Sequence, residues 1–127
     1  KQDCPFDESV DGCSNWFITI LDRVAHAPSS DSRAHLPDVL LSGALHGNER
    51  VGPTAVTETA TLLLKAAHCE ALRIVDSTKN ECQKELREEY GVEDVDRKWL
   101  ARLVTTRRIV VIPSANALGY FRNQREE

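Results

Sequence analysis

The sequence predicts an α/β fold, a partial mixed, mostly parallel β-sheet flanked by helices. Two short apolar stretches carry this prediction, Val39–Leu45 and Ile109–Pro113, and both have the length of core strands. Continuous apolar runs are typical of strands that are buried on both faces. The segments between them have helical spacing of apolar residues. The order strand, helix, helix, strand therefore indicates a crossover unit that packs helices on a twisted sheet.

The N-terminal third is expected to contain one further strand between two loops. Residues 1–15 are polar and contain Pro5 and Gly12, which predicts an irregular entry segment. Residues 16–21 are β-branched and aromatic, which is typical of a strand. Residues 27–37 are rich in Ser, Asp and Pro and are expected to form a loop.

The middle of the chain is expected to be helical. Thr54–Cys69 repeats apolar residues at helical spacing, and Pro53 suits the first turn of that helix. The charged segment 70–93 is ambiguous, with Gln83–Tyr90 compatible with a surface helix that ends at Gly91. A further helix is predicted to run to about Thr106. Its cap would be Asp94 or Asp96, and its apolar face would hold Trp99, Leu100, Leu103 and Val104. Residues 114–127 are read as a polar tail.

Composition limits the function classes. The chain has 127 residues, the size of one domain, and its net charge of −4 argues against general nucleic-acid binding. No apolar run approaches the ~20 residues of a membrane-spanning helix. There is no Met and no charged-then-apolar leader, so we expect a processed or trimmed piece of a longer protein.

Four cysteines allow three disulfide pairings. We expect the local pairs Cys4–Cys13 and Cys69–Cys82, because short loops close most easily. Disulfides favour a secreted or lumenal location. Free thiols in a cytoplasmic protein are the alternative.

His46 and Glu49 are the candidate metal ligands. Residues i and i+3 of a tight turn lie within about 7 Å at Cα, so this imidazole and carboxylate can bind one ion at ~2.1 Å each, a ligand pair that suits zinc. We expect Gly47 to supply a backbone conformation that most residues resist. A hydrogen-bonded loop histidine without metal is the alternative. His35 and Asp38 have the same spacing, but they precede their strand and enclose Pro37.

Two segments resemble the carboxypeptidase A-like zinc metallocarboxypeptidases. In Leu41–Pro53, an apolar strand leads into His-Gly-Asn-Glu and a helix follows, similar to that family's zinc-binding segment. In Ile109–Tyr120, an apolar strand precedes Asn-Ala-Leu-Gly-Tyr, which is similar to the family's Asn-Pro-Asp-Gly-aromatic turn although the two central residues differ. Arg125 then falls where the family carries a substrate-facing arginine. The resemblance spans roughly residues 38–125.

The resemblance implies roles for four residues. His46 and Glu49 would be two of three protein ligands to a catalytic Zn²⁺ whose bound water attacks the C-terminal peptide bond of a peptide or protein. Arg125 would bind the substrate and stabilise its oxyanion. Asn116 would bind the substrate, with turn formation as its alternative role. A solvated surface charge is the alternative for Arg125, Arg122 is its rival, and Tyr120 is expected to pack.

In the family pattern the third ligand and the general-base Glu come later in the chain. The resemblance thus implies that residues 1–127 are the N-terminal portion of one catalytic domain. We expect an open sheet edge and no activity without the remainder of that domain. Two other functions stay open, an aspartoacylase-like zinc deacylase of acyl-amino acids and a non-catalytic binding module of the peptidase fold. The specificity for the cleaved residue is not readable from these residues.

Overall fold

The computed structural model describes residues 15–75 and 81–126. It confirms a mixed α/β chain. The predicted pair Cys4–Cys13 lies outside the described residues. The elements are, in order, β1 (Ile18–Ile20), α1 (Asp31–Ala34), β2 (Asp38–Ser42), α2 (Val51–Val75), α3 (Glu81–Tyr90), α4 (Asp94–Thr106), β3 (Arg108–Ile112) and α5 (Ala117–Arg122).

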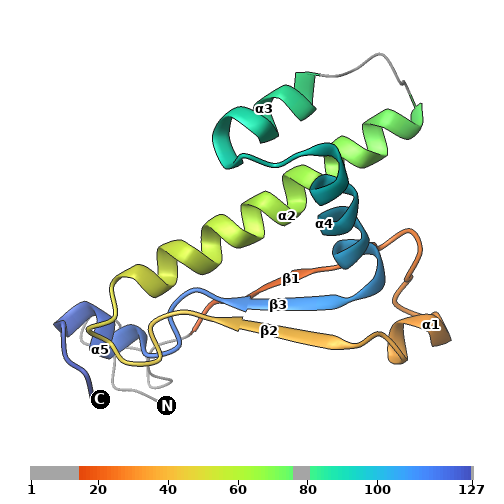
Figure 1. Cartoon of the computed structure of the whole chain (residues 1–127). Helices are drawn as coiled ribbons and strands as arrows, with labels where there is room; N and C mark the ends of the chain where they lie inside the picture. Colours follow the sequence, from red (N-terminus) through yellow and green to blue (C-terminus); the bar gives the residue numbers. More distant parts are fainter. Residues whose placement is uncertain (1–14, 76–80, 127) are drawn as a thin grey trace. The chain divides into compact units, whose positions relative to one another are not determined.

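The three described strands form one sheet in the order β1-β3-β2, with β3 in the centre (Figure 1). Arg108 N donates to Pro37 O over 3.1 Å, and Gly43 N donates to Ile112 O over 2.9 Å. Residue numbers rise together along both strands, which is the order of a parallel pair. Asn15, which precedes β1, donates its Nδ2 to Ala115 O beyond β3, so β1 begins beside the end of β3 and runs the opposite way (Figure 1).

The prediction that Val39–Leu45 is a strand buried on both faces is wrong for the described chain. The strand ends at Ser42 and lies at an edge of the sheet. Val39 is 37% exposed, Leu40 is 64% exposed and Leu45 is 69% exposed. An apolar run indicates that its residues can be buried. The position of the strand in the sheet depends on which other strands pair with it. The central strand is instead β3, where Ile109 and Val111 are buried as expected.

The three longer helices, α2, α3 and α4, lie where helices were expected, with differences at their ends. Helix α2 begins at Val51, keeps Pro53 in its first turn and continues six residues beyond Cys69. Helix α3 ends at Tyr90, and Gly91 follows with a positive φ of 66°, which glycine adopts readily. Helix α4 is capped by Glu93 rather than by Asp94 or Asp96. The prediction of a loop over residues 27–37 and a polar tail over 114–127 is wrong in part, because these segments contain the short helices α1 and α5.

The described residues group into two compact units. One, here called the strand-end unit, takes the described residues of 1–18, 40–58 and 110–127. The other, here called the helical unit, takes those of 19–39 and 59–109. None of the helices in the described part of the chain combines the length and apolar character that crossing a membrane requires.

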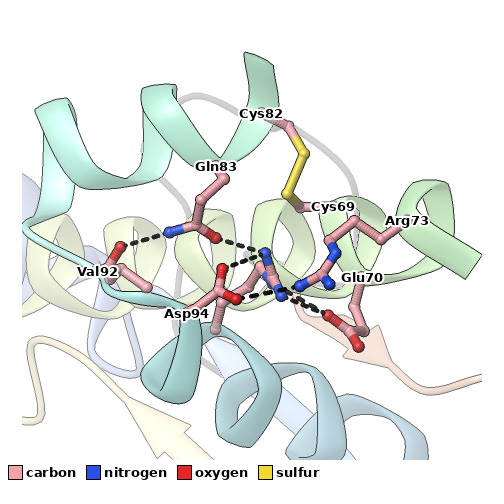
Figure 2. The surroundings of a disulfide bond; sticks show 8 residues. Cys69, Glu70, Arg73, Cys82, Gln83, Val92 and Asp94 are labelled. Atoms are coloured by element: carbon pink, nitrogen blue, oxygen red, sulfur yellow. Dashed lines mark hydrogen bonds and ion pairs between the residues drawn. A yellow bond between two sulfur atoms is a disulfide. The ribbon is translucent and has the colours of Figure 1, made fainter. Parts of the chain in front are cut away.

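A disulfide joins two helices at the apolar core of the helical unit. Cys69 of α2 and Cys82 of α3 are bonded, with their Cα atoms 5.7 Å apart, which confirms this predicted pair (Figure 2). Cys69 is fully buried with Leu86 and Val92 in one apolar cluster. Partly buried side chains pack around this cluster: Leu62, Cys82, Tyr90 and Leu100.

A buried arginine joins the same three helices. Arg97 of α4 is 0% exposed, although arginine is rarely buried unless it is paired. Its Nε donates to Glu70 of α2 over 3.0 Å, and its Nη1 donates to Gln83 of α3 over 2.6 Å and to Asp94 over 3.0 Å. Its Nη2 lies 3.0 Å from the same Glu70 oxygen without hydrogen-bond geometry. Gln83 also donates to Val92 O over 2.9 Å (Figure 2).

We expect Arg97→Met to lower the free energy of unfolding by about 2–3 kcal/mol, because it removes three charge-assisted hydrogen bonds while the half-exposed acids regain water. Urea unfolding of the purified chain measures this change. Lys98→Met, at the exposed neighbouring position, is the matched control and should stay within about 0.5 kcal/mol of wild type. Equal losses in the two variants would show that the Arg97 contacts do not stabilise the helices.

A second ion pair joins the starts of β2 and β3. Arg108 donates through Nε and Nη2 to the two carboxylate oxygens of Asp38, at 2.6 and 2.5 Å. These hydrogen bonds lower the pKa of Asp38 below its ordinary value of 3.8. The stabilisation from ionised Asp38 is complete above the ordinary pKa and is lost as the pH falls through the lowered pKa.

We therefore expect wild-type stability to fall more steeply below about pH 4 than that of Asp38→Asn, which has no carboxyl group to protonate there. Thermal unfolding between about pH 5 and pH 2 measures the two slopes. Glu126→Gln removes an exposed carboxyl elsewhere and should keep the wild-type slope. Parallel curves for wild type and Asp38→Asn would refute the pairing.

Candidate functional site

The candidate site is built on the bend between β2 and α2, where backbone segments touch. A Cβ on Gly43 would lie 2.5 Å from Pro113 O and 2.6 Å from Gly52 C, and a Cβ on Gly52 would lie 2.7 Å from Ala44 N. Side chains at these positions would separate the strand end, the helix start and the segment after β3. The two glycines therefore permit the bend through close approach.

Ala44, inside this bend, has a left-handed backbone with φ of 46°. This conformation costs a residue with a Cβ atom about 1–2 kcal/mol. Ala44 is 2% exposed, and its carbonyl accepts a hydrogen bond from Asn116 N over 3.0 Å. Packing and hydrogen bonding therefore hold the turn that directs the chain to His46.

Gly47 is also required by contact. A Cβ there would lie 2.0 Å from Gly119 C and 2.4 Å from both Gln124 O and Tyr120 N. The glycine with a positive φ among the described residues is Gly91, so the prediction that Gly47 supplies an unusual conformation is wrong. Its function is to let the bend lie directly against the backbone of α5.

His46 and Glu49 lie side by side and share a hydrogen bond, which is the contact expected for the alternative without metal; metal binding by the pair stays a prediction. His46 Nδ1 lies 2.8 Å from Glu49 Oε1, and His46 N donates to Glu49 Oε2 over 3.3 Å. Glu49 N donates to His46 O over 3.1 Å, which closes the turn between them. Their side chains are 37% and 49% exposed, so both can be reached from solvent.

The bend favours the ionised form of Glu49. The side-chain hydrogen bond from His46 lowers the pKa of Glu49 most, and the backbone N–H of His46 lowers it further. The charges of His46 and Arg125 act in the same direction, while desolvation raises the pKa. Glu49 is therefore a carboxylate at neutral pH, so Nδ1 of His46 is the donor in their hydrogen bond.

The donor set fits a divalent cation with two ligands. Tetrahedral zinc with ligand bonds of about 2.1 Å would separate the nitrogen and the oxygen by about 3.4 Å. The observed 2.8 Å needs only a small opening of the pair. The imidazole would then carry its proton on Nε2, so that Nδ1 is free to bind the metal. Within the described residues, no group of three His, Cys, Asp or Glu side chains is placed to hold a metal ion.

Arg125 lies at the same bend. Its carbonyl accepts a hydrogen bond from Gly47 N over 3.4 Å, and its charge lowers the pKa of Glu49. The structure thus brings Arg125 together with the predicted ligand pair. Its rival Arg122 lies in the last turn of α5.

Asn116 is placed as a helix cap. Its side chain is 5% exposed, and Oδ1 accepts a hydrogen bond from Gly119 N over 2.7 Å at the start of α5. This is the turn-forming role that the sequence left as the alternative. Substrate binding by Asn116 stays a prediction, and its burial does not favour that role.

Sequence reasoning missed one interaction of the site. The Arg50 guanidinium lies 4.3 Å from the centre of the Tyr120 ring, and Arg50 Nε donates to Asn123 Oδ1 over 3.1 Å. Tyr120 packs, as expected, and its contact is this cation. Asn123 has a left-handed φ of 55° as the C-cap of α5. An asparagine that follows a short apolar segment is a known C-cap signal, and it could have revealed α5.

We expect Gly47→Ala to lower the free energy of unfolding by about 1–3 kcal/mol, because the new methyl group would overlap the backbone of α5. Urea unfolding measures the loss. Asn48→Ala, at the exposed next position, should change stability by less than about 0.5 kcal/mol. A Gly47→Ala protein as stable as Asn48→Ala would show that the bend does not lie against α5.

Comparison of the chain with models of known protein families, with curated proteins and with solved structures gave no match. The geometry of the bend and the resemblance of its residues therefore carry the functional interpretation.

Proposed function

We propose that His46 and Glu49 bind zinc in a metallocarboxypeptidase-like hydrolase that removes C-terminal residues from peptides or proteins. The observation that carries this proposal is the convergence of Nδ1 and Oε1 at 2.8 Å in a bend directly after a strand. Imidazole nitrogen with carboxylate oxygen is a donor pair that zinc accepts. The lowered pKa of Glu49 also favours metal binding, because it keeps this carboxyl group ionised.

Each residue of the bend has a role in the proposal. Bound zinc would supply a polarised water and a Lewis acid. Arg125, whose charge lowers the pKa of Glu49, would stabilise a substrate carbonyl that gains negative charge. Gly47 and Asn116 act through packing, because they hold α5 and the segment of Arg125 against the bend.

The proposal also concerns the rest of the sheet. In it, residues 1–127 are the N-terminal portion of a carboxypeptidase-like catalytic domain with a mostly parallel sheet, whose remainder supplies the third ligand and the general base. The related family has an interior strand before its His-Gly-x-Glu segment, whereas β2 is an edge strand with Val39 and Leu40 exposed. The proposal therefore requires a further strand along β2, which exposed apolar side chains on an edge strand favour.

The Cys69–Cys82 disulfide supports a secreted or lumenal location as part of the same proposal, because reducing compartments keep most such pairs open.

We expect the purified chain to bind one zinc ion, and we expect His46→Ala and Glu49→Gln each to weaken the binding by at least about tenfold, since removal of a ligand costs more than loss of an outer-shell partner. Calorimetric titration with zinc measures the affinity. His35→Ala is the matched control, because His35 and Asp38 repeat the spacing of the ligand pair.

Wild-type affinity in His46→Ala would refute the metal site and leave the pair as a hydrogen-bonded turn. An equal loss in His35→Ala would show that the zinc binds to surface histidines in general. Either result would remove the main support for the proposed hydrolase.

A further inference from the structure

A small pocket lies along α4, in the helical unit. Its volume is about 210 Å³, and it is lined by Trp99, Arg102, Leu103, Thr106 and Arg107. The first four residues have the spacing i, i+3, i+4 and i+7, so they share one face of the helix. Trp99 was predicted to belong to the buried face of this helix, but it is 60% exposed.

The inner face of α4 is formed by other residues. Arg97, Ala101 and Val104 are the buried residues of α4. The core contacts of α4 therefore leave the indole of Trp99 and the side chain of Arg102 exposed beside the pocket.

The pocket brings together two arginines that have no acidic neighbour among the residues that line it. No carboxylate lines the pocket, and no ion pair joins Arg102 or Arg107 to an acid within residues 15–75 and 81–126. Six other cations of this unit have carboxylate partners: Lys65 with Glu85 and Glu89, Arg73 with Asp94, Lys84 with Glu88, Arg87 with Glu93, Arg97 with Glu70 and Asp94, and Arg108 with Asp38. Arg23, Arg33 and Lys98 have none among the described residues, but they do not line the pocket.

Arg107 is held in position at the end of the helix. It is the C-cap of α4 with an extended backbone, and its Nη1 donates to Thr106 O over 2.8 Å. This bond fixes one guanidinium at the pocket. Arg102 lies within the helix and is exposed, so its donors are accessible to a ligand.

We infer that this pocket binds a small ligand that carries an oxyanion next to a flat ring. Guanidinium groups bind carboxylates and phosphates through paired N–H donors. The indole face of Trp99 offers a stacking surface for the ring. In a chain with net charge −4, two cations without carboxylate partners at one pocket are the feature that selects an anion over a cation or a neutral ligand. The inference does not depend on the zinc proposal.

The test titrates Trp16→Phe protein with phenyl phosphate and follows the fluorescence of Trp99, the other tryptophan of the chain. Phenylacetate replaces phenyl phosphate in a second arm, which distinguishes a phosphate from a carboxylate as the bound group. Benzyl alcohol supplies the ring without charge, and inorganic phosphate supplies the charge without the ring. We expect at least one aryl anion to bind saturably and both partial ligands to bind at least about tenfold more weakly.

Arg102→Gln should weaken aryl-anion binding by about tenfold or more, since it removes charge-assisted hydrogen bonds. Lys98→Gln is the matched control: it removes the same charge at an exposed position of α4 that does not line the pocket, and it should keep wild-type binding. Unfolding curves of both variants check that α4 remains folded.

Three outcomes would overturn the inference. They are the absence of saturable binding by either aryl anion, equal affinity for benzyl alcohol or inorganic phosphate, and equal weakening in Arg102→Gln and Lys98→Gln. Zinc titration of Arg102→Gln should match wild type, so failure of the oxyanion pocket and failure of the zinc site remain distinguishable.

Discussion

The close approach of backbones at Gly47 and Gly119 is the constraint on which the candidate site depends. It places the segment of Arg125 beside the bend that holds His46 and Glu49. Gly47 contacts these segments through its backbone alone. A single added methyl group at Gly47 would therefore disturb the arrangement. The left-handed turn at Ala44 and the glycine contacts at Gly43 direct the chain into the same bend. The geometry of the candidate site is therefore set by main-chain packing, which positions the side chains of His46 and Glu49.

The helical unit is held together by a disulfide and a buried arginine in addition to an apolar cluster. Its apolar cluster is small, and the disulfide and the Arg97 hydrogen bonds join the same helices. Burial of a charge is expensive, and the partners Glu70, Gln83 and Asp94 offset that cost with directed hydrogen bonds. Hydrogen bonds require particular distances and angles, whereas apolar contacts tolerate sliding. We therefore regard Arg97 as a residue that fixes the positions of the helices, in addition to its effect on stability.

The two proposed sites carry side chains of opposite charge. At the bend, an anion and an imidazole face each other, and their mutual hydrogen bond holds the positions that a cation would take. At the α4 pocket, two cations share an opening without an acidic neighbour. The carboxylate and imidazole of the bend would suit a metal cation. The two guanidinium groups of the pocket would suit an oxyanion, because opposite charges attract.

Local sequence determined much of this protein. The positions of α2, α3 and β3, the end of α3 at Gly91, the Cys69–Cys82 pair and the convergence of His46 with Glu49 all follow from spacing, turn residues and short loop closure. These features depend on residues within about a dozen positions of one another.

Tertiary structure alone decided the remainder. The edge position of β2, the burial of Arg97 and the open pocket at Trp99 each depend on which distant segment lies alongside. An apolar strand has the same sequence pattern at an edge or in the centre, and an arginine has the same spacing on a buried or an exposed face. Pairing and packing between distant segments settle such choices, since burial is a property of the assembled fold rather than of a residue.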